Sequence, residues 1–173
     1  MPEKVLVAYA TKHGSTTEIA DKIAEILGSA GIHAVALPIE HIGDLASYSA
    51  VVLGSAIYAG QWRKEATRFL KAHEKELASR PVWLFSSGPT GEGDVATLLK
   101  GELLPHDVQN IANRICPRGI TVFHGELDDA KLNLFERIIV KGVNAPIGDY
   151  RDWVEIVRWA EGIAESLKQT IDA

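Results

Sequence analysis

Five short apolar runs recur along the chain, and segments with helical spacing separate most of them. The runs cover residues 5–10, 34–37, 50–53, 82–85 and 120–123. A strand in a parallel sheet is buried on both faces, so it reads as a continuous apolar run rather than an alternating one. Strands that alternate with helices are typical of an α/β fold. We therefore expect a parallel sheet with helices on both faces.

The helical segments fit this plan, with one addition. Apolar residues at helical spacing predict helices after Ile19, across positions 66–77 and 106–115, and after an N-cap at Asp149. The apolar face of the last helix is expected at positions 153, 156, 157, 160, 163 and 167. An extra helical segment lies within residues 126–148, with its apolar pattern at Leu132, Phe135, Ile139 and Val143. It could rest on the sheet, form a dimer face or touch a membrane, and its balanced charges favour packing on the sheet.

Length and composition narrow the function classes. The 173 residues suit a single domain, 1–173, and one cysteine, Cys116, rules out an internal disulfide and is expected to be a packing residue. No apolar run approaches a membrane span and no signal peptide is recognisable, so we expect a cytoplasmic protein. A net charge of −5 without a basic stripe argues against nucleic acid as a partner. Peripheral membrane contact and oligomeric state stay open.

The first apolar run leads into a loop rich in hydroxyls and glycine. Its residues are Thr11, Lys12, His13, Gly14, Ser15 and Thr16. Ser15 and Glu18 have the spacing of a capping box, which predicts a helix start at this point. The first turn of a helix presents unpaired N–H groups and the positive end of the helix dipole, so this loop suits a phosphate.

Two further loops have similar composition. Residues 54–62 follow the third run and contain glycine, small residues and two aromatics, while residues 86–91 follow the fourth run. In a doubly wound sheet of order 2-1-3-4-5, the ends of strands one, three and four are neighbours. The three loops are therefore expected to meet in one crevice.

At this point the sequence resembles the flavodoxin-like FMN proteins, whose phosphate loop reads Thr/Ser-x-Thr-Gly-x-Thr. Thr11, Gly14 and Thr16 match this motif, and His13 stands where the family usually has Thr. Segments 54–62 and 148–153 are similar to the subgroup that contains the menaquinone-dependent protoporphyrinogen dehydrogenases. Those enzymes carry a longer, more basic and more aromatic insertion than residues 126–148. The likeness covers nearly the whole chain.

The resemblance implies FMN as the cofactor and assigns the three loops to it. The first loop would hold the phosphate through backbone N–H groups and the hydroxyls of Thr11, Ser15 and Thr16, with the roles of Lys12 and His13 left open. The second would lie against the isoalloxazine ring, covered by Tyr58 or Trp62, although Trp62 could instead pack at its helix. The third would meet the other side of the ring or its pyrimidine edge. The members of the second and third loops are Ser55, Ala56, Ile57, Tyr58, Trp62, Ser87, Gly88, Pro89, Thr90 and Gly91.

The resemblance also sets the functional expectations. The flavin carries the redox chemistry, so no catalytic side chain and no metal are required. The leading hypothesis is an oxidoreductase that transfers one or two electrons, similar to protoporphyrinogen dehydrogenase. Its partner would be a quinone, a small-molecule substrate or a redox protein. The alternatives are a non-enzymatic electron carrier and a binding module without flavin. An apolar wall and the phosphate charge near the ring would favour a low reduction potential.

Several other motifs carry less weight. Residues 91–96 match Gly-x-Gly-x-x-Ala, but they do not lead directly from a strand into a helix, so we interpret the match as coincidence. The strand ends carry Thr11 and Ser55 rather than the acidic cluster of a response regulator. His124 ends the fifth run and could contact a substrate, while Arg151 to Trp153 are expected to begin the last helix.

Overall fold

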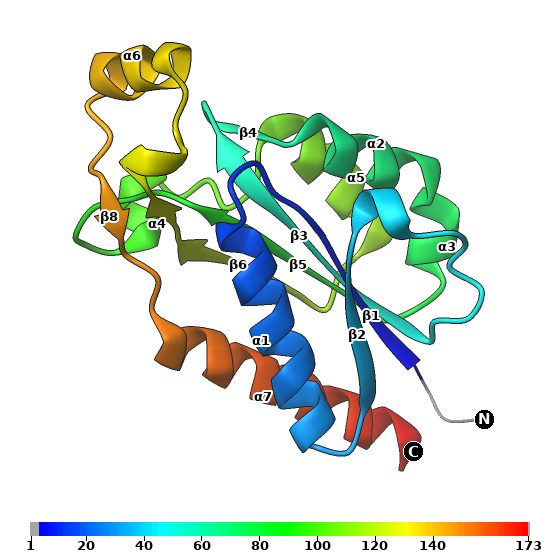
Figure 1. Ribbon diagram of the computed structural model, residues 1–173. Helices are drawn as coiled ribbons and strands as arrows, with labels where there is room; N and C mark the ends of the chain where they lie inside the picture. Colours follow the sequence, from blue (N-terminus) through cyan, green and yellow to red (C-terminus); the bar gives the residue numbers. More distant parts are fainter. Residues whose placement is uncertain (1–3, 173) are drawn as a thin grey trace.

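The computed structural model describes residues 4–172 and has a parallel sheet at its centre (Figure 1). The spatial order of the strands is β2-β1-β3-β5-β6, which confirms the predicted order. A short strand, β4, pairs antiparallel with β3 and was not predicted. The strands are β1 (Lys4–Ala10), β2 (His33–Pro38), β3 (Ala50–Tyr58), β4 (Gln61–Trp62), β5 (Val82–Gly88) and β6 (Gly119–His124).

Helices cover both faces of this sheet, as expected, and each face has its own apolar core. On one face lie α1 (Ser15–Ser29) and α7 (Trp153–Ile171), and on the other lie α2 (Lys64–Ala72), α3 (Glu74–Ala78) and α5 (His106–Ile115). The predicted helix at 66–77 is thus two helices, which meet at His73. Both cores share the strands, because side chains alternate between the two faces of a sheet.

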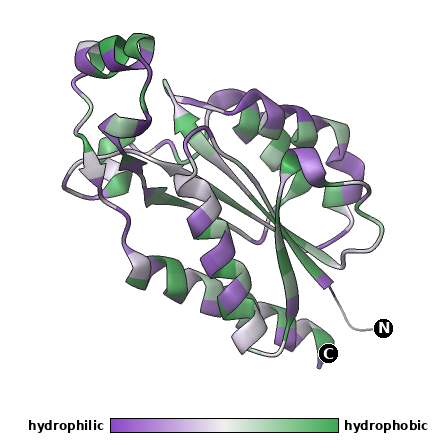
Figure 2. Ribbon diagram, in the orientation of Figure 1, coloured by the Kyte–Doolittle hydropathy of each residue, from purple (hydrophilic) through white to green (hydrophobic). Residues whose placement is uncertain are grey.

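Residues 126–148 form an insertion beyond the carboxyl ends of the strands. Its base is the antiparallel pair β7 (Glu126–Leu127) and β8 (Gly148–Asp149), and between them lie a short 3-10 turn and α6 (Leu134–Val143). The expectation that α6 packs on the sheet was wrong. The side chains of Phe135 and Val143 are 70% and 68% exposed, and Figure 2 shows apolar residues on this outlying helix.

Three local expectations need correction. The N-cap of α1 is Gly14, with no side-chain cap, so Ser15 and Glu18 do not form a capping box. Asp152 rather than Asp149 caps α7, through hydrogen bonds from the N–H groups of Val154 and Glu155. Cys116 is exposed rather than packed, because it is the left-handed residue that ends α5.

The remaining elements are short. They are a 3-10 turn at Ile39–His41, another at Asp129–Lys131, and α4 (Val95–Leu98). Within residues 4–172, no helix has both the length and the apolar character needed to cross a membrane.

Candidate functional site

The register of the sheet brings the three predicted loops to one edge. Ser55 on β3 is paired with Ala10 on β1 and with Ser86 on β5, so these three strands end side by side. The loops that follow them therefore lie next to one another, as the sequence predicted.

The first loop has the features of an anion site. Thr11 Oγ1 accepts a hydrogen bond from the N–H of Gly14 at 3.0 Å, which closes the loop just before α1. Gly14 has φ 91°, a left-handed angle that favours glycine. The first N–H groups of α1 have no partner within the helix and no side chain caps them.

The hydroxyl of Thr16 adds a second observation at this helix start. The side chain is fully buried, and its Oγ1 has no hydrogen-bond partner among residues 4–172. A buried hydroxyl without a partner costs free energy, so its presence indicates that a polar group from outside the chain satisfies it. The loop thus offers several donors to one acceptor-rich group.

The second loop is a tight hairpin. Ala59 and Gly60 both have positive φ angles, of 51° and 74°, which suits a two-residue turn between twisted strands. Ser55 Oγ accepts a hydrogen bond from the N–H of Arg63 at 2.9 Å and donates one to the carbonyl oxygen of Ala56 at 2.9 Å. This hydroxyl therefore fixes the hairpin.

The two aromatic residues of the hairpin have different surroundings. Trp62 is buried in the core, and its indole N–H donates to Ser86 Oγ at 2.8 Å, which fits the packing alternative rather than a cover for a ring. Tyr58 lies against the first loop, since Lys12 Nζ is 3.8 Å from the centroid of its ring. The Tyr58 hydroxyl has no hydrogen-bond partner among the described residues. Tyr58 is thus the aromatic residue that the fold leaves at the site.

The third loop is held close to its neighbours. A Cβ on Gly88 would lie 2.9 Å from Ile57 Cβ, and one on Gly125 would lie 2.3 Å from the carbonyl oxygen of Gly88. Both contacts are too short for a side chain, so glycine is required for this packing. Ser87 is almost fully buried, and its hydroxyl has no partner within the described part of the chain. Thr90 and Gly91 follow at the edge of the loop.

The insertion contacts both the first and the third loop, which the sequence did not suggest. Glu136 of α6 lies 2.6 Å from His13 Nε2 and 3.4 Å from Lys12 Nζ, although its side chain belongs to a surface helix. At the other end, a Cβ on Gly91 would lie 3.2 Å from Pro146 Cγ. The insertion therefore reaches from the first loop to the third.

Glu136 is a buried acid whose charge is maintained by its neighbours. Its residue is only 4% exposed. Burial raises the pKa of Glu136, but the hydrogen bond from His13 and the charges of His13 and Lys12 outweigh this, so the net pKa lies below 4.5. No signal in the sequence indicated this contact, because Glu136 and its partner His13 are 123 positions apart in the chain.

Arg151 joins the base of the insertion to α1. Its side chain is 5% exposed and forms ion pairs with Asp149, with Glu126 at 3.3 Å and with Glu18. The hydrogen bond and charge of Arg151 lower the pKa of Asp149. Arg151 therefore precedes α7 instead of beginning it, and Glu18 serves this pairing instead of a cap.

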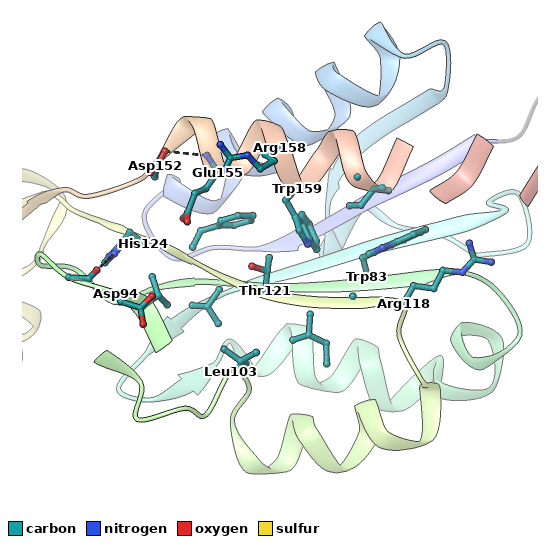
Figure 3. Close-up of a pocket in the computed structure, with 18 residues that line it drawn as sticks. Trp83, Asp94, Leu103, Arg118, Thr121, His124, Asp152, Glu155, Arg158 and Trp159 are labelled. Atoms are coloured by element: carbon teal, nitrogen blue, oxygen red, sulfur yellow. Dashed lines mark hydrogen bonds between the residues drawn. The ribbon is translucent and has the colours of Figure 1, made fainter. Parts of the chain in front are cut away.

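A separate groove of about 720 Å³ lies beside the edge strand β6 (Figure 3). It runs between β6, α7 and the segment around Asp94, and it includes no residue of the first loop. His124 lies at the end of this groove, where it contacts the third loop. Within residues 4–172, no group of three side chains has the arrangement of a metal site.

Comparisons with known proteins agree with this geometry. The model of the flavodoxin-domain family matches residues 6–152. Protoporphyrinogen IX dehydrogenase (quinone) of Escherichia coli strain K12 is 24% identical over 178 residues, which cover 93% of this chain and 94% of that protein.

Solved structures show the same fold. A flavodoxin from the domain Archaea has a TM-score of 0.62 at 15% identity, with 95% of this chain and 99% of that chain covered. Rubredoxin oxygen:oxidoreductase from Desulfovibrio gigas has a TM-score of 0.67 at 13% identity, with 98% of this chain but 37% of that chain covered. A flavodoxin mutant from Pseudomonas aeruginosa has a TM-score of 0.59 at 17% identity, with 95% and 99% covered.

Proposed function

Because this chain belongs to the flavodoxin-domain family, whose cofactor is FMN, we propose that it is an FMN-dependent oxidoreductase similar to protoporphyrinogen dehydrogenase. In this role it takes hydrogen from a porphyrinogen-like substrate and passes the electrons to a quinone, which becomes a quinol. The more general statement, that the chain has a flavodoxin-type redox function, follows from its membership of this family.

The residues present fit FMN. The buried, unpartnered hydroxyl of Thr16 and the free N–H groups at the start of α1 suit the phosphate, which carries only acceptors. We propose that Thr11, Ser15 and Thr16 hold the phosphate, with Lys12 beside them. The unpartnered hydroxyls of Tyr58 and Ser87 suit the polar edge of the ring. When bound, the isoalloxazine ring supplies the capacity to take up and release one or two electrons.

The chain's own residues then orient the cofactor. The hairpin that carries Tyr58 is fixed by Ser55, and the third loop is fixed by its close contacts at Gly88. Rigid surroundings of this kind reduce the ordering cost of binding.

The apolar surface of α6 is the observation that carries the proposal of an organic substrate. Leu134, Phe135 and Ile138 are 77%, 70% and 63% exposed, on a helix whose Glu136 contacts the first loop. Exposed apolar side chains beside a cofactor site are unfavourable in water, and contact with a large, flat and poorly soluble substrate would bury them. A quinone has the same character, so either reactant could meet this surface.

Anaerobic turnover of the purified protein tests this proposal. An absorption spectrum first measures bound FMN, and protoporphyrinogen oxidation is then followed with menadione as the acceptor. We expect turnover in the wild-type protein and a higher KM in the double variant Leu134→Gln with Ile138→Gln, while FMN content stays unchanged. The matched control is Ile171→Gln, because Ile171 is also exposed but lies at the end of α7.

A non-enzymatic electron carrier is the second candidate. The shared fold is compatible with it, since 95% of this chain superposes on 99% of a solved flavodoxin. Bound FMN without porphyrinogen turnover, together with electron transfer to a redox protein, would establish the carrier. A colourless protein that refuses added FMN would exclude both candidates.

We further propose that the protein acts in the cytoplasm. Cys116 is exposed and unpaired, and an exposed free thiol suits a reducing compartment. Contact of α6 with a membrane surface is compatible with this location.

A further inference from the structure

His124, the last residue of β6, lies between two carbonyl oxygens of the loop that follows β5. Its Nδ1 is 3.1 Å from the carbonyl oxygen of Pro89, and its Nε2 is 2.8 Å from that of Gly93. The reversed ring orientation would place carbon atoms against both oxygens, so the nitrogen-facing orientation is the one that forms hydrogen bonds.

The proton count of the ring decides how many of these bonds exist. A carbonyl oxygen can only accept, and a neutral imidazole has one N–H group, so it can donate to Pro89 or to Gly93 but not to both. The imidazolium has two N–H groups and can donate to both. Loss of its proton therefore leaves a nitrogen lone pair facing a carbonyl oxygen.

The two carbonyls differ in what else holds them. The Pro89 oxygen also accepts from the N–H of Gly125 at 3.2 Å, so this end of the loop is held without the histidine. The Gly93 oxygen, by contrast, has no hydrogen-bond donor among residues 4–172 other than His124. Gly91 and Gly93 both have φ 112°, an angle that favours glycine, and glycine restricts the backbone less than any other residue does. The Gly93 end thus depends on an N–H group at Nε2, and holding both ends at once takes the second N–H group of the imidazolium.

The charges around His124 suit a cation. The groove at the edge of β6 brings the carboxylates of Asp94, Asp152 and Glu155 and the guanidinium of Arg158 to the same region, and Arg118 lies at the opposite end (Figure 3). On the other side along the chain, Glu126 is already paired with Arg151. Carboxylates therefore outnumber cations in this region. His124 itself is half-buried, so solvent protons can reach its ring.

We propose that His124 is a proton-operated positioning residue: as the imidazolium it ties Gly93 to the end of β6 and holds residues 89–93 in the shape that receives FMN. This inference rests on the proposed function, since it concerns the third loop of the same site. The neutral ring can donate to only one of the two oxygens and turns a lone pair toward the other, so deprotonation loosens this double attachment and FMN must then order the loop as it binds. Loss of one charge-assisted hydrogen bond corresponds to an affinity about tenfold lower.

The first experiment measures FMN affinity by quenching of flavin fluorescence, at about pH 5 and about pH 8, on either side of ordinary histidine titration. The variants are His124→Gln and, as a matched control, His33→Gln, which changes an exposed histidine at the start of β2. The FMN phosphate also changes its charge over this range, but it is common to all three proteins. The ratio of wild-type to variant affinity therefore isolates His124.

We expect this ratio to be about tenfold larger at the lower pH for His124→Gln, and to be the same at both pH values for His33→Gln. If the ratio for His124→Gln were also the same at both pH values, the proposal would be overturned. If His124→Gln does not fold, as judged by circular dichroism, His124→Asn takes its place, because its amide can still reach toward Pro89.

The second experiment uses the wild-type protein without FMN. Amide resonances of Gly91 and Gly93 are followed by NMR together with the ring proton of His124 during a pH titration. We expect the amides and the ring to change together. A ring that titrates while both amides stay still would refute the role of His124. Failure of the wild type to bind FMN at either pH would instead refute the proposed function, and the NMR result would still decide on the histidine.

Discussion

Two residues of the first loop, Gly14 and Thr16, connect backbone geometry with ligand chemistry. The sequence indicated the hydroxyls and the glycine because their order is that of a phosphate loop before a helix. It misassigned Ser15 and Glu18 as a capping box, because the same spacing arises when glycine caps the helix and Glu18 pairs with Arg151. A residue 133 positions away cannot be recognised from local spacing.

Gly14→Val is predicted to weaken FMN binding while the fold is kept. A β-branched residue at φ 91° is strained by about 1–3 kcal/mol, so the loop moves away from its observed shape. A Cβ at this position meets no atom within 4 Å, so the core is not disturbed. FMN titration should show an affinity at least about tenfold lower, and the circular dichroism spectrum should be unchanged. Gly43→Val is the control, and equal affinity in the Gly14 variant would contradict the assigned loop.

Thr16→Val is predicted to change stability and FMN affinity in opposite directions. The substitution removes a buried hydroxyl that has no partner, so the protein without FMN should gain about 1 kcal/mol in its free energy of unfolding. FMN affinity should fall about tenfold, because the phosphate loses a donor. Urea unfolding and fluorescence titration measure the two quantities. Thr67→Val on α2 serves as the control, and unchanged FMN affinity in the Thr16 variant would show that the hydroxyl faces no ligand.

Among the elements, the parallel strands and the helix of the insertion were predictable, and the packing of that helix was not. The apolar runs located the parallel strands of the main sheet, because burial on both faces leaves a local mark in the sequence, but not the short antiparallel β4. The helix at 106–115 also has the predicted bounds. For α6 the pattern at Phe135 and Val143 suggested a buried face, yet the buried positions are Glu136 and Val140. An ion pair with a distant loop, rather than apolar spacing, sets the orientation of this helix.

The contact of α6 with the first loop is predicted to depend on pH through Glu136. The pKa of Glu136 is lower in the folded protein than in the unfolded chain, where it is near 4.5. The ionised carboxylate therefore stabilises the folded state fully above the unfolded pKa, and this stabilisation is lost as the pH falls through the folded pKa. Hydrogen exchange of α6 amides should therefore accelerate below about pH 4.5 relative to α1. In Glu136→Gln this acceleration should be absent, whereas Glu161→Gln should behave as the wild type. Exchange that is independent of pH in the wild type would count against the contact.

At the scale of the whole molecule, the alternation of strands and helices predicts a parallel sheet, and the resemblance to flavodoxins supplies its strand order. The two apolar cores flank one sheet and share its strands, so we propose that residues 1–173 form a single domain, of which residues 4–172 are described. The groove beside β6 could not be predicted, because it depends on how α7 and the segment around Asp94 pack against an edge strand.

A single cooperative unfolding transition is predicted, and FMN should raise its midpoint. A ligand that binds only the folded state at about 100 times its Kd adds about 2.7 kcal/mol to the free energy of unfolding. Calorimetry with and without FMN measures this shift, and riboflavin, which lacks the phosphate, should give a smaller one. Two separate transitions would contradict the single domain, and equal shifts for both flavins would contradict the phosphate loop.

The insertion touches the first loop through Glu136 and the third loop through Pro146. One piece of chain thus acts as a strap across both, and it carries an apolar outer surface. Because both loops share this segment, a displacement of α6 would reach the first and the third loop together, so the ion pair of Glu136 links the position of a surface helix to the shape of both loops.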